Sequence, residues 1–479
     1  MRRLPFFLSA AMLVLLGGCT MIPAYTRPDA PVPEGWPEGP AYRDPAASGP
    51  DSASAAELPW REFFTDQRLQ AVIEAALYNN RDLRLAALNV QRARAIYGIQ
   101  RAALYPAVDA VASGYKERLP ADLSSSGDSR IVEQYDVGLG VFGWEIDLFG
   151  RIRSLKDRAL KEFLATEQAR RGTQILVVSA VADAWLTLAA DRENLKLAET
   201  TYETQKDAYD LIRRRYDIGL ASELDLNRAQ TQVDTALADI ARFTRLVAQD
   251  ENALNLLVGT GSAMPPEALP VELGSIEPFK DISAGISSAV LLNRPDILQA
   301  ENFLKAANAN IGAARAALFP RISLTSSIGT ASSELSGLFG SGSGTWLFAP
   351  QASLPIFDAR LWAALEATKA EREIVLTQYE KAIQTAFREV ADALAVQGTV
   401  DRQLAAQESL VRATEATYRL SDSRYTMGID SYLSVLDAQR SLYAAQQGLV
   451  FLRLARLANQ VQLYAVLGGG AGPDAVDSP

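Results

Sequence analysis

The sequence predicts a mainly α-helical protein with a small β part, built from two copies of one long unit. Most of the chain is rich in Ala, Leu and Arg and carries apolar residues at helical spacing. Four short segments break that pattern and alternate apolar with small or polar residues, as strands do. The same order of segments occurs twice along the chain. The fold class is therefore an internal two-fold repeat of long helices with two strands in each half.

The repeat can be read directly from the residues. RRRYDIGLASELDL at 213–226 returns as DSRYTMGIDSYLSV at 422–435, an offset of 209 positions. RAALYP at 101–106 returns as RAALFP at 315–320, an offset of 214 positions. Two long copies differ from an array of many short repeats, so a solenoid is a poor interpretation.

The N-terminus carries an export signal. MRRLPFFLSAAMLVLLGGC has two basic residues, an apolar stretch too short to span a membrane, and small residues before Cys19. Cys19 is the only cysteine, so residues 1–18 are predicted to be a lipoprotein signal and Cys19 the lipidated residue. The alternative is an ordinary signal that happens to end near a cysteine. Residues 19–59, rich in Pro, Ala, Ser, Gly and acids, are predicted to be a lipidated tether.

The first repeat, 60–262, contains three predicted helical stretches. Residues 67–104 form the first and end before Pro106, because proline pushes the preceding residue into extended geometry. Residues 151–212 would extend roughly 93 Å as one unbroken helix. Residues 222–258 form a shorter return helix.

The second repeat, 281–468, follows the same plan, after a linker at 263–280 and before a C-terminal tail at 469–479. Its helices are predicted at 281–318, 360–424 and 431–467. Both long helices carry apolar residues spaced four, three and four apart, as in coiled coils. These residues are Val177, Val181, Ala184 and Leu188 in one helix, and Ile383, Phe387, Val390 and Leu394 in the other. Two long antiparallel hairpins per chain follow.

The two hairpin turns contain residues suited to ending one helix and starting the next. Gly219 and Gly428 fit the left-handed residue that ends a helix. Ser222 and Ser431 fit the N-cap of the return helix.

Two strands are predicted between the short and long helices of each repeat, near 107–117, 133–146, 321–331 and 344–356. YDVGLGVF at 135–142 and ISLTSSI at 322–328 place apolar residues on one face and small or polar residues on the other. That pattern suits a strand between lipid and water. The alternative is a pair of water-facing hairpins on a soluble domain.

The composition argues against an enzyme. Histidine is absent, the lone cysteine is assigned to lipidation, and no P-loop, GxGxxG or GxSxG motif occurs. A net charge of −10 argues against nucleic acid as a partner. We therefore expect no catalytic residue, no metal site and no cofactor.

A membrane role would have to rest on the strands. We expect no stretch after residue 18 to be long and apolar enough for a membrane-spanning helix, since even 175–190 contains Asp183. A closed β-barrel is then the remaining way to span a membrane. Four strands are too few to close a barrel, so several chains must share one.

These features together resemble the TolC family. The resemblance rests on the duplication, the four strands, WEIDLFGR at 144–151 with LPIFDAR at 354–360, and RYxxGxxSxLxxLxAQ at 424–439. With its lipidation signal, the chain is more narrowly similar to the NodT-type lipoproteins of multidrug efflux. The resemblance implies a lipid-anchored homotrimer in the outer membrane of a Gram-negative bacterium. It implies a twelve-stranded barrel and an α-helical tunnel through the periplasm.

The resemblance also implies the function and the partners. The trimer would be the exit duct of a tripartite efflux system and would conduct small molecules passively. Its partners would be a periplasmic adaptor and an inner-membrane transporter of the RND type. The hairpin tips would close the periplasmic end and dock the adaptor, through Arg215, Tyr216, Gly219, Ser222, Arg424, Gly428 and Ser431.

Four gate residues carry over from the family. Tyr425 matches a tyrosine that ties the inner hairpin to its neighbour, and Asp225 matches the acid with which it pairs. Asp437 matches an acid that rings the entrance. At Asp430 the sequence departs from the family prototype, which has an arginine there. An acid instead suggests a ring of three carboxylates, whose mutual repulsion would raise their pKa and favour cations.

Each gate residue also has a simpler interpretation. Asp225 could complete a capping box with Ser222. Asp430 could be an acid favoured by the start of a helix, and Tyr425 could be a packing residue. For the whole chain, the main alternative is a lipid-anchored periplasmic adaptor or coiled-coil scaffold without a pore. A third possibility, an exported hydrolase, lacks any recognisable nucleophile–base set in the sequence.

Overall fold

The computed structural model describes residues 20–42, 53–55, 58–283 and 287–470. The signal at 1–18, Cys19 and most of the tail lie outside the described residues. The chain divides into two compact units. The strand unit comprises Met1–Asp29, Asn89–Thr166 and Ala300–Tyr379, and the hairpin unit comprises Ala30–Leu88, Glu167–Gln299 and Glu380–Pro479.

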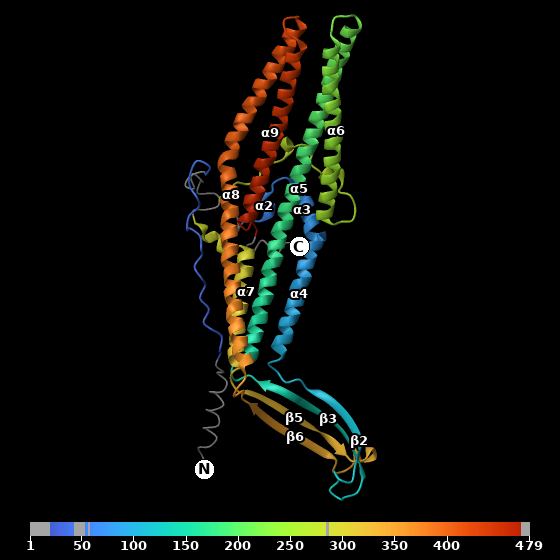
Figure 1. Ribbon diagram of the computed structural model, residues 1–479, viewed down its shortest axis with the longest axis vertical. Helices are drawn as coiled ribbons and strands as arrows, with labels where there is room; N and C mark the ends of the chain where they lie inside the picture. The colour runs from blue at the N-terminus through green and yellow to red at the C-terminus, as the bar shows by residue number, and fades with distance from the viewer. Residues whose placement is uncertain (1–19, 43–52, 56–57, 284–286, 471–479) are drawn as a thin grey trace. The chain divides into compact units, whose positions relative to one another are not determined.

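The strand unit contains one antiparallel sheet of four strands in the order β2-β3-β5-β6 (Figure 1). The strands are β2 Asp109–Leu119, β3 Arg130–Ile146, β5 Arg321–Ser332 and β6 Gly344–Ser353. All four predicted strands are therefore confirmed, with shifted ends. The edge strands β2 and β6 are exposed along almost their whole length. The sheet therefore presents two free edges.

The two faces of the sheet differ in character. Leu139, Ile328 and Trp346 are cross-strand neighbours on one face, which we call the apolar face. Ser327 and Asp136 lie on the other face, which carries mostly small and polar residues. This division agrees with the alternation expected for a strand between lipid and water.

A β-bulge interrupts strand β3. The pairing shifts between Val141 and Trp144, where three steps along β3 match two along β5. Gly143 has a φ of 69° at this point, and its N–H donates to the Thr325 hydroxyl over 3.1 Å. The extra residue returns Trp144 to the apolar face opposite Leu324. Strict alternation from the sequence would have placed Trp144 on the other face.

Two predicted helices are broken. The stretch 67–104 forms two helices, α3 Gln67–Asn79 and α4 Arg81–Ala102. Asn80 between them is extended, and its carbonyl oxygen Oδ1 accepts from the N–H groups of Asp82 and Leu83. Asn80 thus caps α4, and the prediction of one continuous helix was wrong.

The stretch 281–318 is also not one helix. Its first part contains β4 Ile282–Ser283 and the 3₁₀ turn η4 Ser288–Asn293, and α7 begins only at Pro295 and ends at Ala316. Proline forces the preceding Arg294 into extended geometry, with φ −64° and ψ 139°. The same rule that ended the helices at Pro106 and Pro320 therefore also sets the start of α7.

The long helices exceed their predicted lengths. α5 Arg151–Asp217 and α8 Ala359–Thr426 have 67 and 68 residues, each roughly 100 Å long. α6 Glu223–Val258 and α9 Tyr432–Val466 return against them, so α5 with α6 and α8 with α9 form two antiparallel hairpins (Figure 1). Four of the predicted coiled-coil residues are almost fully buried, namely Val181, Leu188, Ile383 and Val390. Among the described helices, α5 alone contains a stretch apolar enough to cross a membrane, contrary to our expectation, but half of that stretch is buried within the protein.

Short elements of the hairpin unit surround an aromatic cluster. The rings of Phe63, Phe64, Phe279 and Tyr464 lie 4.2–6.0 Å apart by centroid. Phe63 belongs to the one-turn helix α2 Trp60–Phe63, and its carbonyl accepts from the N–H of Lys280. The remaining short elements are β1 Ala53–Ser54, parallel to β4, and the 3₁₀ turns η2 Pro266–Ala268, η3 Leu273–Ser275 and, in the strand unit, η5 Leu335–Gly337.

The described part of the predicted tether, 20–42, is docked on the protein. In the strand unit, the Pro23 carbonyl accepts from Asn308 Nδ2 over 2.8 Å, and Glu301 accepts from Tyr25 and Arg27. In the hairpin unit, Trp36 is buried and stacks on Phe387 at 5.3 Å. The composition suggested a loose linker, but the few apolar and charged side chains within it bind the helices.

Candidate functional site

The two hairpin turns have the same backbone design. α5 ends in a Schellman motif, in which Gly219 has a φ of 78° and the N–H of Leu220 donates to the carbonyl of Arg215 over 2.7 Å. α8 ends in the same way, with Gly428 at φ 75° and the N–H of Ile429 donating to the carbonyl of Arg424. The left-handed glycines predicted from the sequence are therefore present at both turns.

The two N-caps differ. Ser222 Oγ accepts from the N–H of Asp225 over 3.1 Å and donates to its carboxylate over 2.7 Å. Ser431 occupies the equivalent N-cap but makes no side-chain cap hydrogen bond. The capping interpretation of Asp225 is thus supported within the chain, and Asp225 also lies 4.0 Å from Arg228.

One apolar cluster joins the two hairpins just below their turns. Its buried members come from α5, α6 and α9: Ile212, Ala229, Tyr432, Val435 and Leu436. Tyr425 from α8 packs against this cluster, and its ring lies 5.2 Å from the ring of Tyr432. Burial raises the pKa of Tyr432 above its usual range, so this side chain stays neutral. The apolar contacts hold the four helix ends together.

Tyr425 binds an arginine of the other hairpin. Arg215 Nη1 donates to the Tyr425 hydroxyl over 3.0 Å, and the guanidinium lies 5.2 Å from the centre of the ring. The family resemblance pairs Tyr425 with Asp225, but the hydroxyl partner recorded within the chain is Arg215. Sequence reasoning placed Arg215 at the tip without this role, because no sequence pattern links two residues that lie 210 positions apart.

Asp430 is held by an arginine from the end of α8. Its carboxylate accepts from Arg424 Nε over 2.6 Å and from Arg424 Nη2 over 3.0 Å. The Arg424 hydrogen bonds lower the pKa of Asp430 below its usual range. Within one chain the carboxylate therefore stays ionised, and its charge is balanced by Arg424. A rise caused by repulsion among three copies would be a property of an assembly and stays a prediction.

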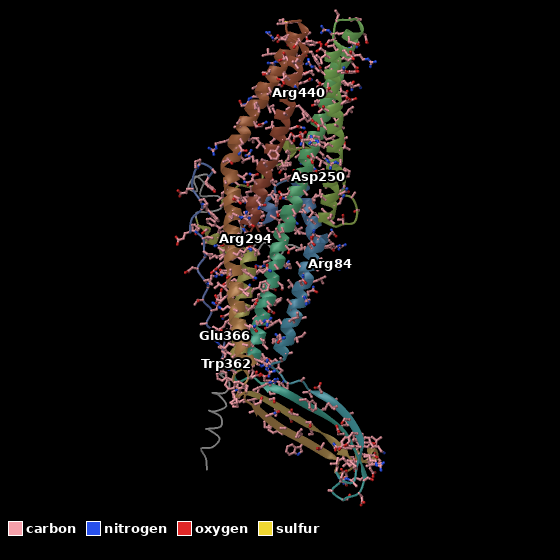
Figure 2. The ribbon with its side chains drawn as sticks, viewed as in Figure 1. Arg84, Asp250, Arg294, Trp362, Glu366 and Arg440 are labelled. Carbon is pink, nitrogen blue, oxygen red and sulfur yellow. The ribbon has the colours of Figure 1, made fainter. Side chains whose placement is uncertain are left out.

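The remaining tip residues are less constrained. Asp437 is largely exposed and lies 3.4 Å from Arg440, which Figure 2 labels on α9. Tyr216 is exposed at the end of α5. Across the part of the chain that the structure describes, no group of three or more acidic, histidine or cysteine residues could hold a metal ion. The tips therefore offer charge, hydrogen bonds and exposed surface.

The chain matches known proteins over most of its length. A family model described as outer membrane efflux protein matches residues 72–260 and 286–469. The chain is 50% identical to toluene efflux pump outer membrane protein TtgC of Pseudomonas putida over 463 residues, covering 96% of this chain and 94% of that one. It is 42% identical to outer membrane protein OprJ of Pseudomonas aeruginosa over 417 residues, covering 86% and 85%.

A solved structure agrees with the fold. The open state of the MtrE outer membrane channel of Neisseria gonorrhoeae has a TM-score of 0.85 to this chain at 37% identity. The match covers 95% of this chain and 100% of that one. The likeness thus includes both repeats and the strands.

Proposed function

The chain belongs to the outer membrane efflux protein family, and from this premise we propose that it is the exit duct of a tripartite efflux system. It lies in the outer membrane of a Gram-negative bacterium, as its relatives do. It conducts small molecules passively from the periplasm to the exterior. It performs no chemistry of its own, and the pumping energy comes from its partner transporter.

One observation supports this function most directly: the sheet has four strands and two exposed edges. Unpaired backbone groups cannot face lipid, so both edges must be paired in a membrane. Three copies supply twelve strands and pair every edge in one barrel. The apolar face with Leu139, Ile328 and Trp346 then contacts lipid, and the face with Ser327 lines the pore.

The test is the mass and the conductance of the purified protein. We expect light scattering in detergent to give three chains per particle, and planar bilayers to show discrete channel currents. A lipid-anchored scaffold without a pore would give no currents. A stable monomer, or a trimer that passes no ions, would contradict the proposal.

The hairpin tips form the periplasmic gate in this proposal. Asp430 and Asp437 bring carboxylates to the entrance, and Tyr425 and Asp225 belong to the contacts that hold the tips. The pairing of Asp430 with Arg424 supports a ring of alternating charges rather than one of bare carboxylates. Single-channel recording of Asp430→Ala tests this role. Unchanged conductance and unchanged block by cations would remove Asp430 from the gate.

The partners follow from the family and the exposed tips. A periplasmic adaptor docks on the tips, through the residues around Gly219 and Gly428, and an RND-type transporter in the inner membrane supplies the substrates. Cysteines at Tyr216 and Ser431 can be cross-linked in intact cells with and without the candidate adaptor. Cross-links at these positions that do not depend on the adaptor would argue against docking there.

Lipidation of Cys19 completes the proposal. Residues just after it are held beside α7, since the Met21 carbonyl accepts from Arg315 and the Pro23 carbonyl from Asn308. Metabolic labelling with palmitate should mark the natural chain and fail to mark Cys19→Ala. Equal labelling of both chains would exclude Cys19 as the attachment site.

A further inference from the structure

We propose that the face of α4 that contains Gly98 receives α8 of a second copy, with Ala363 of that copy seated against Gly98. This inference rests on the proposed function, because it concerns how the copies join. It names one contact within the assembly, derived from the internal repeat. All the residues that carry it lie in the strand unit.

The repeat gives each helix a counterpart. α4 and α7 both have 22 residues, and an offset of 214 positions carries Arg81–Ala102 onto Pro295–Ala316. The offset of 209 carries Arg151, the first residue of α5, onto Arg360, the second residue of α8. Gly98 is therefore equivalent to Gly312, and Ala363 is equivalent to Ser154.

Within the chain, α7 packs on the long helix of the preceding repeat. A Cβ atom on Gly312 would lie 2.8 Å from Ser154 Oγ of α5, and 2.6 and 2.9 Å from Cγ1 and Cα of Ile22, so glycine lets α7 approach both α5 and the N-terminal segment. Near this point Asn310 accepts from Arg158 over 3.3 Å. Gly312 also lies beneath Ile22 of the N-terminal segment. The short helix of the second repeat, α7, is thus covered by the long helix of the first repeat, α5.

No described residue of the same chain fills the equivalent contact on α4. No residue of α4 is buried, and a Cβ atom on Gly98 would meet nothing within 4 Å. Ile99 is 68% exposed, whereas its counterpart Ala313 is 7% exposed. Glycine inside a helix costs about 1 kcal/mol relative to alanine. No contact with the described residues of the same chain requires that cost at Gly98.

The other side of the proposed contact, at the start of α8, is also exposed within one chain. Ser154 is fully buried, but its counterpart Ala363 is exposed. Trp362 beside it, labelled in Figure 2, is 62% exposed, and Phe357 just before α8 is 91% exposed. Large apolar side chains grouped in this way mark a surface that another protein or a membrane covers.

The occupant is a second copy, because the missing partner of α4 is the long helix of a second repeat. The contact joins repeat two of one copy to repeat one of the next, which is a head-to-tail interface that can close into a ring. The contact also lies next to the proposed pairing of sheet edges between copies. β6 leads directly into α8, and α4 leads directly into β2. Where β6 of one copy pairs with β2 of the next, α8 and α4 of the same two copies therefore come together.

The first test is a disulfide between copies. We expect Gly98→Cys with Ala363→Cys to give covalent dimers and trimers when isolated membranes are oxidised, because close Cβ atoms permit the bond. The matched control is Gln100→Cys with Ala363→Cys, since Gln100 lies on the opposite side of α4. A conducting, trimeric protein that forms no bond at Gly98, or forms it equally at Gln100, overturns the contact.

A second pair of variants does not depend on disulfide geometry. Gly98→Trp should keep the helical content of the chain, since the position is open within it, but should lose the trimer in light scattering. Gln100→Ala, on the half-buried opposite side of α4, should keep both. A trimeric Gly98→Trp protein would overturn the inference and leave the channel function standing. A natural chain that is itself monomeric would overturn the proposed function and this contact with it.

Discussion

Ser222 and Ser431 occupy equivalent N-caps but make different hydrogen bonds. Ser222 accepts from the N–H of Asp225 and donates to its carboxylate, whereas Ser431 makes no side-chain cap bond. The residue equivalent to Asp225, 209 positions further along the chain, is Ser434, which offers no carboxylate. The first turn of α6 therefore depends on its cap more than the first turn of α9.

The same substitution at both caps should separate them. Ser222→Ala should destabilise the first turn of α6 by about 1 kcal/mol, because a cap hydrogen bond is lost. Ser431→Ala should change little. Amide hydrogen exchange in the first turns of α6 and α9 measures this. Equal effects at the two serines would show that the cap bond of Ser222 is not formed in solution.

The ion pair of Asp430 predicts a pH effect. The Arg424 hydrogen bonds lower the pKa of Asp430, so the carboxylate keeps its charge to a lower pH than an ordinary aspartate. In Arg424→Gln the pKa should rise, and the pH at which block of the channel by spermine fades should rise with it. The control is Arg440→Gln, whose contact with Asp437 is longer at 3.4 Å. If the pH at which spermine block fades did not change in Arg424→Gln, the pairing of Arg424 with Asp430 would be refuted.

Single-residue roles were only partly predictable. The glycines and serines of the turns could be assigned because their conformations are local properties of helix ends. The pairing of Asp430 with Arg424 crosses a turn at a separation of six residues, outside the spacing rules for one helix. The pairing of Arg215 with Tyr425 joins positions 210 apart. Such contacts depend on tertiary structure.

The helices and strands were largely predictable because each long segment repeats its pattern in the second half. The predictions were wrong where a single residue interrupts a long helical pattern. Asn80 breaks a helix through its side-chain cap, and Pro295 delays the start of α7. The bulge at Gly143 was missed because strict alternation was assumed along the whole strand, although the extra residue shifts the phase of the pattern before Trp144.

The two faces of β5 should respond differently to water-soluble reagents. Ser327→Cys should react with a charged methanethiosulfonate and lower the conductance, because Ser327 faces the proposed pore. Ile328→Cys, the next residue, should remain unmodified within lipid. Single-channel recording before and after the reagent measures both. Reaction at both positions, without any change in current, would argue against a membrane-spanning sheet.

Glu301 should control the docking of the N-terminal segment on α7. Burial alone would raise its pKa, but hydrogen bonds from Arg27 and Lys305 lower it to about 2. A lowered pKa stabilises docking above the ordinary value near 4.5, and this stability disappears as the pH falls toward 2. Glu301→Gln should mimic that loss at neutral pH, at a cost of about 2 kcal/mol.

Hydrogen exchange of residues 21–27 measures the docking. The matched control is Glu162→Gln, since Glu162 forms an exposed pair with Arg158 within α5. Exchange that stays slow in Glu301→Gln would show that packing of Ile22, rather than charge, holds the segment.

For the whole molecule, the contact between the hairpins should influence opening. Arg215 donates to Tyr425 and lies over its ring, so Arg215→Ala removes a link worth about 1 kcal/mol. We expect about a fivefold rise in the ratio of open to closed states in single-channel records. Arg213→Ala, in the same turn of α5 and exposed, is the control. Equal ratios of open to closed states in the two variants would show that the contact between Arg215 and Tyr425 does not influence gating.

The docked N-terminal segment has a consequence for biogenesis. Residues 21–27 are made near the beginning of synthesis, but their binding surface, Glu301 to Arg315, is made some 270 to 290 residues later. Contacts so distant in sequence form late, after large loops have closed. The leading end must therefore cross the inner membrane and wait unbound until the second repeat has followed it and folded. A truncated polypeptide stalled before residue 300 would expose this end to periplasmic proteases.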